Sequence, residues 1–159
     1  MKLKINISQI FDYAQDELGM IGKRIKTQDG EPTYSSVQLS SREKPVVARL
    51  VQEAVQAAFS VIPERLSDYH KEDEDILFSA NGGRDSDELT EFFNDVFMNY
   101  VLAYVLAQYL SMTAPELAKK YITQADSLLI NLRSAMLNKS AFFSSADSLE
   151  ETSGSVLYN

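Results

Sequence analysis

Two long stretches with helical periodicity lie next to each other in this chain, separated only by Ser111 and Met112. They span residues 86–110 and residues 113–137, and in each the apolar residues recur every three or four positions, as on one face of an α-helix. Helices joined by so short a connection pack as antiparallel neighbours. We therefore predict a mainly α fold, a small helical bundle built on this C-terminal helical hairpin, with short extended segments at the N-terminus and in the centre.

Capping signals mark the start of both helices. Asp85 and Glu88 have N-cap and N3 spacing, and Thr113-Ala114-Pro115-Glu116 is a capping box with proline in the first turn. The helix predicted over residues 86–110 carries an apolar surface that is wider than one neighbouring helix covers. We therefore expect other elements to cover this helix on more than one side. The members of this surface are Leu89, Phe92, Phe93, Val96, Phe97, Tyr100, Val101, Tyr104, Val105 and Tyr109.

The N-terminal residues predict a short strand, a short helix and an irregular arm. Polar and apolar residues alternate over residues 2–7, which is the period of a half-buried strand. Apolar residues at helical spacing follow in residues 8–18, and Gly19 and Gly22 are expected to end that helix. Residues 26–39 contain turn formers without helical periodicity and are expected to form a loop or arm.

A second helix and an extended central segment come next. Ser40 and Glu43 have the spacing of a capping box, so a helix is expected to begin there and to stop before Pro63, which lacks an amide donor. Beyond it, an acidic run at residues 72–75, an apolar triplet and the turn signal Asn81-Gly82-Gly83 predict an extended segment with a turn.

The composition narrows the possible chemistry. The chain has no cysteine and a single histidine, which excludes disulfides, thiolate metal sites and histidine-rich metal sites. Carboxylates are paired at i,i+4 spacing, Asp12 with Asp16 and Glu91 with Asp95, but the Glu-x-x-His element of carboxylate metal bundles does not occur. We interpret these pairs as solvated helix faces and expect no cofactor or metal.

The N-terminal residues and the apolar run favour a chain that stays in the cytoplasm where it is made. The first residues lack the continuous apolar region of a signal peptide. Residues 96–110 are apolar but too short for a membrane span of about 20 residues, and they contain Asn99 and Gln108. We predict a buried core helix and no membrane partner.

The charge is concentrated in the middle of the sequence. Of the formal net charge of −8, residues 50–112 contribute three basic and twelve acidic residues, whereas residues 1–49 are slightly basic. Binding to nucleic acid is dominated by lysine and arginine meeting phosphates, so this acidic surface is expected to repel DNA rather than bind it.

One pair of residues suggests catalysis. Arg65 and His70 have the R-x4-H spacing of RNases built on the HEPN helical domain, in which arginine stabilises phosphate charge and histidine assists proton transfer. In this chain the pair follows Pro63, between predicted helices and beside the acidic run. We therefore interpret both as surface residues and expect no enzyme; an HEPN-like RNase is kept as an alternative, as is a helical interaction or regulatory module.

The N-terminal strand needs a partner, either Ile76-Leu77-Phe78 of the same chain or an edge of a neighbouring copy. Oligomerisation is therefore a hypothesis, with residues 1–138 as one helical domain and residues 139–159 as a Ser-rich tail that is flexible or orders on assembly. The candidate contacts between subunits are Leu3, Ile5, Ile7, Tyr34, Val37, Phe142, Phe143, Leu157 and Tyr158.

The order of elements resembles a known family. A K-I-x-I-S-x-I-F-D strand and helix, a second helix, an acidic extended segment and a long apolar helix come in turn, and Met112-Thr113-Ala114-Pro115-Glu116-Leu117 leads into Tyr121-Ile122-Thr123-Gln124-Ala125. Over roughly residues 1–138 this pattern is similar to the small head–tail connector proteins, also called adaptor or head-completion proteins, of tailed bacteriophages and prophages.

The resemblance implies a virion structural protein without catalytic residues. It implies a ring of copies, commonly twelve, that docks beneath the portal protein, contacts tail or other connector proteins and continues the channel through which genomic DNA passes without specific binding. Under this interpretation, acidic residues facing the lumen would keep DNA from adhering. The candidate channel-facing residues are Glu72, Asp73, Glu74 and Asp75.

Overall fold

A computed structural model describes residues 1–24, 37–81 and 87–150. In this part of the chain, helices dominate and three strands form one small sheet, so the predicted mainly α fold is confirmed. The elements in order are β1 (Lys2–Asn6), α1 (Ile7–Arg24), the 3-10 turn η2 (Ser41–Glu43), α2 (Lys44–Val61), β2 (Leu66–Glu72), β3 (Asp75–Ala80), α3 (Asp87–Thr113) and α4 (Pro115–Glu150).

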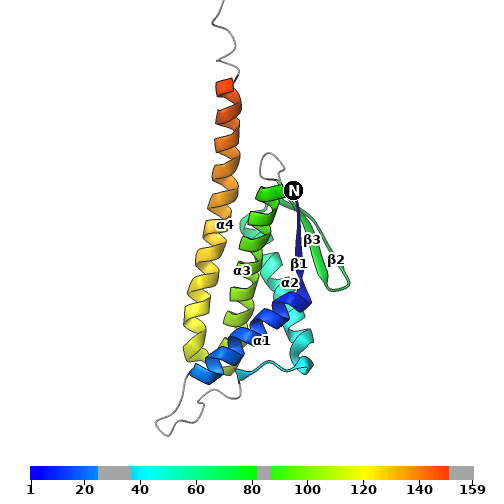
Figure 1. The fold of residues 1–159 in the computed structure, drawn as a ribbon, viewed down its shortest axis with the longest axis vertical. Coiled ribbons are helices and arrows are strands. Elements are labelled where there is room, and N and C mark those ends of the chain that lie inside the picture. The colour runs from blue at the N-terminus through cyan, green and yellow to red at the C-terminus, as the bar shows by residue number, and fades with distance from the viewer. Residues whose placement is uncertain (25–36, 82–86, 151–159) are drawn as a thin grey trace, which may run out of the picture.

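The helical hairpin of α3 and α4 is the longest feature of the fold, and the two helices lie side by side (Figure 1). Their connection differs slightly from the prediction. Thr113 does not cap α4; it closes α3, because its hydroxyl donates back to the carbonyl of Tyr109 at 3.0 Å. Ala114 alone separates the helices, and Pro115 opens α4 where its missing amide donor costs nothing. The helix expected to end near residue 137 continues to Glu150.

Helix α3 is the centre of the core. It contacts α1, α2, α4 and β1, which explains why its apolar surface is wider than one partner requires. Phe93, Phe97 and Tyr100 are almost completely buried.

Within the described residues α3 is also the one helix long and apolar enough to cross a membrane, but half of its most apolar window is buried against the other elements, as in a core helix.

The three strands form an antiparallel sheet in the order β1-β3-β2. The N-terminal strand therefore finds its partner in the same chain, with Leu3 opposite Phe78 and Ile5 opposite Ile76. Leu3 and Ile5 are buried beneath the helices, and Ile7, the first residue of α1, is buried as well. This burial corrects the expectation that Leu3, Ile5 and Ile7 contact a neighbouring subunit.

Helix α1 is longer than expected because its two glycines do not stop it. It begins after Asn6, whose side-chain oxygen accepts the amide of Gln9 at 2.9 Å, and it runs through Gly19 and Gly22 to Arg24. A glycine inside a helix costs only about 1 kcal/mol relative to alanine. Burial of neighbours such as Leu18 outweighs that cost.

The capping box before the second helix is confirmed. The Ser40 amide donates to the Glu43 carboxylate at 2.7 Å, a 3-10 turn follows, and α2 then runs to Val61, two residues before Pro63. Val37, which precedes this turn, is fully buried, so it too is a core residue and not a contact between subunits.

Candidate functional site

The acidic run at residues 72–75 forms the tip of the β2–β3 hairpin. β2 ends at Glu72 and β3 begins at Asp75, so Asp73 and Glu74 make the turn. Asp73 has φ of 52°, a left-handed conformation that aspartate tolerates better than most residues. One turn of this segment therefore lies in the charge run. The turn predicted at Asn81-Gly82-Gly83 falls largely outside the described residues, which include only Asn81.

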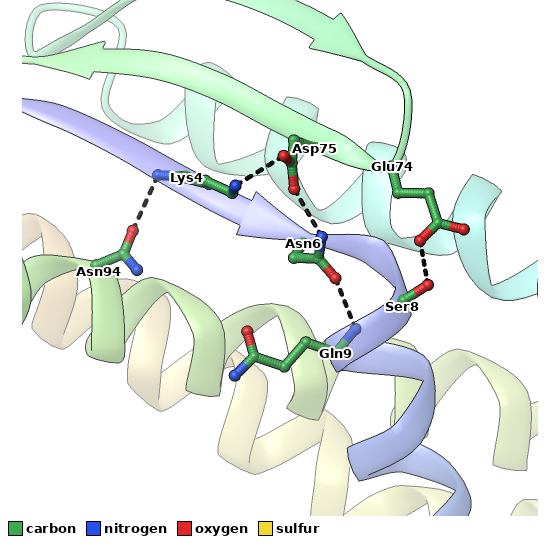
Figure 2. Close-up of polar contacts among 7 residues, drawn as sticks. All are labelled: Lys4, Asn6, Ser8, Gln9, Glu74, Asp75 and Asn94. Carbon is green, nitrogen blue, oxygen red and sulfur yellow. Dashed lines mark hydrogen bonds and ion pairs between the residues drawn. The ribbon is translucent and has the colours of Figure 1, made fainter.

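Asp75 joins the hairpin tip to strand β1. Its carboxylate pairs with Lys4 Nζ at 2.7 Å and accepts a hydrogen bond from Asn6 Nδ2 at 2.7 Å. The same Asn6 caps α1, and the backbone amide of Lys4 donates to Asn94 of α3 at 2.9 Å (Figure 2). One polar network thus connects the hairpin, the start of α1 and the side of α3.

Glu74 joins the tip to two helix starts. It accepts a hydrogen bond from the Ser8 hydroxyl at the start of α1, drawn in Figure 2, and pairs with Lys44 Nζ at the start of α2 at 2.6 Å. The hydrogen bond from Lys44 holds the pKa of Glu74 below its usual value, and that from Lys4 does the same for the pKa of Asp75. Both contacts are exposed to solvent, so each stabilises the fold only slightly.

The tip is much less acidic than its sequence suggests. Lys4 and Lys44 compensate Asp75 and Glu74, and Lys71 lines the same cavity of about 440 Å³ as Lys44 and Glu74. Glu72 and Asp73 are exposed and remain available to repel an anion. The predicted channel-facing role of the four acids therefore rests mainly on these two.

We expect the network at the tip to make stability depend on pH in the acid range. The folded pKa of Glu74 lies below its usual 4.5, so its stabilising contribution is complete above that pH and is lost as the pH falls through the lower folded pKa. Urea unfolding midpoints measured from neutral pH into the acid range should fall, and Lys44→Met should flatten the part of that fall due to Glu74. Lys23→Met is the control, since no described acid pairs with this exposed lysine. If the unfolding midpoint of Lys44→Met fell with decreasing pH as steeply as that of the unaltered chain, the stabilising role of the Glu74–Lys44 contact would be contradicted.

Arg65 and His70 do not form a shared cleft. Arg65 precedes β2, and its guanidinium donates to the carbonyl of Asn81 at 3.3 Å. His70 lies on β2 beyond a β-bulge that includes Asp68, whose φ is 55°. His70 lines a cavity of about 450 Å³ on the sheet, and Arg65 is not among the residues of that cavity. This arrangement gives no support to joint action of the two side chains on one phosphate.

The remaining predicted residues have mixed outcomes. Tyr34, Leu157 and Tyr158 lie outside the described residues, whereas Phe142 and Phe143 fall within α4. The described residues contain no group of three metal-ligating side chains. No local sequence pattern marks Lys4, Asn6 and Lys44 as partners of the acidic run, because these contacts join residues that are far apart in the sequence. The only sequence signal was the position of Lys4 on an alternating strand.

The chain was compared with family models, with curated proteins and with solved structures, and no match was found in any of them.

Proposed function

We propose that this chain is a non-enzymatic structural subunit of a tailed-phage or prophage head–tail connector. Copies of it form a ring, commonly of twelve, that docks beneath the portal protein, joins tail or other connector proteins and continues the DNA channel. Its site of action is then the head–tail interface of the virion, after synthesis in the host cytoplasm.

The observation that carries the proposal is the order of elements on which the resemblance rests. A strand leads into a helix, a second helix follows, an acidic hairpin comes next, and a long apolar helix forms a hairpin with the last helix. The hairpin tip supports the assigned channel role in part: Glu72 and Asp73 project as exposed acids from an element that the lysine contacts tie to the body. Exposed carboxylates of this kind discourage DNA from adhering.

Electron microscopy of the purified chain, with and without the portal ring encoded by the same genome, tests the proposal. We expect rings, or added density beneath the portal. A chain that remains monomeric and never binds a portal would contradict the proposal and favour a helical interaction module. A Glu72→Lys/Asp73→Lys variant should still bind the portal, because the channel role of these acids is separate from docking. The ring formed by this variant should retain DNA that the ring of the unaltered chain releases.

A further inference from the structure

Two exposed surfaces of opposite charge lie on different sides of the molecule. The first, which we call the acidic face, consists of Asp12, Tyr13 and Asp16 on α1 and Glu91, Phe92 and Asp95 on α3. The second, which we call the basic face, consists of Lys119, Ile122, Asp126, Ile130 and Arg133 on α4.

The acidic face combines four carboxylates with apolar anchors. Tyr13 and Phe92 are 47% and 44% exposed, which is high for rings of that size in a folded chain. Tyr13 and Asp95 line the same cleft of about 340 Å³, where α1 crosses α3 (Figure 1). The carboxylates of this face form no ion pair within the described residues. Aromatic side chains are enriched in protein interfaces, where a rim of charged residues commonly surrounds them.

The basic face combines two cations and one acid with exposed aliphatic side chains. Ile130 is 64% exposed and Ile122 is 43% exposed, and the cations Lys119 and Arg133 lie beside them at helical spacing. Asp126 lies in the same stripe, so the face has a formal charge of +1 against −4 for the acidic face. Lys119 and Arg133 form no ion pair in the part of the chain that the structure describes.

The two faces point in different directions. Lys120 and Gln124 of α4 line a cavity with Glu17 of α1, so that side of α4 faces α1. Ile122 lies two residues from each of them, which is about 200° around an α-helix. The basic face therefore points away from α1, and one copy cannot bring its own two faces together.

We propose that the basic face of one copy docks on the acidic face of the next, in a head-to-tail contact between identical chains. Opposite charges and exposed apolar anchors on both faces favour a second copy as the occupant. A contact between two different faces repeats from copy to copy, and it closes into a ring when the rotation allows. The inference rests on the proposed function for the closed ring, whereas the contact itself can be tested without a portal.

Charge reversal on each face tests the contact, with light scattering of the full chain as the readout. Lys119→Glu/Arg133→Glu and Glu91→Lys/Asp95→Lys should each assemble at least about tenfold more weakly than the unaltered chain. Mixing the two variants should restore assembly. In alternating order, the reversed positions 119 and 133 of one variant meet the reversed positions 91 and 95 of the other with opposite charges, and the next contact joins two unaltered faces. Circular dichroism confirms that both variants are folded.

A matched control separates the local contact from net charge. Lys2→Glu/Arg49→Glu changes the net charge by as much as Lys119→Glu/Arg133→Glu but at exposed positions outside both faces, and its assembly should be unchanged. A monomeric unaltered chain, variants that assemble normally, or a mixture that does not recover would each overturn the contact. Portal-bound rings that survive both reversals would leave the connector proposal standing, whereas charge-dependent assembly without portal binding would contradict only the connector proposal.

Discussion

Phe97→Ala is expected to destabilise the chain by about 3–5 kcal/mol, the usual cost of removing a buried phenylalanine ring. Phe97 is completely buried in α3. Its ring contacts those of Phe78 at 4.9 Å and Tyr100 at 6.4 Å between centroids, so it joins the sheet to the helical core. Single domains have total stabilities of about 5–15 kcal/mol, so this loss is a large fraction of the whole. Urea unfolding followed by circular dichroism measures it.

Phe92→Ala is the matched control, since it makes the same substitution on the same helix. Phe92 is 44% exposed and meets the ring of Phe93 at 5.4 Å. Its truncation removes less buried surface and leaves no internal cavity, so the loss should be about 1 kcal/mol or less. Equal losses for the two variants would show that α3 does not lie in the core as described.

The helices could be predicted from the sequence because their signals are local. Apolar residues at three- and four-residue spacing set the faces of α3 and α4, and the Ser40–Glu43 capping box marks the start of η2 and α2. The end of α1 could not be predicted in this way. Gly19 and Gly22 resemble stop signals, and only the tertiary burial of residues such as Leu18 shows why the helix continues.

The hairpin and its polar network depend on contacts that local patterns do not contain. Asp73 lies in a charge run that gave no turn prediction, yet the chain turns there, because pairing of β3 with both β1 and β2 fixes the register. The partners of the acids are equally remote in sequence: Asp75 meets Lys4, and Glu74 meets Lys44. The sequence could therefore identify the acidic run but not how far lysines compensate it.

The burial of β1 changes which surfaces are available for assembly. The sequence left open whether this strand pairs within the chain or with a neighbour, and the pairing with β3 places Leu3 and Ile5 in the core. An alternating strand looks the same in both cases, because its period records one buried face and not the identity of the partner. Among the described helices, the exposed faces of α1, α3 and α4 remain candidates for the proposed contacts between copies.

Ile5→Ala should lower the stability of the isolated monomer by about 2–5 kcal/mol, because Ile5 is completely buried and its truncation leaves a cavity between sheet and helices. Lys2→Ala, at an exposed position on the same strand, should change stability by about 0.5 kcal/mol or less. Unfolding should be measured at several low protein concentrations. Since β1 pairs within its own chain, the Ile5→Ala loss should not depend on concentration. A loss confined to concentrations at which copies associate would instead place this strand between subunits.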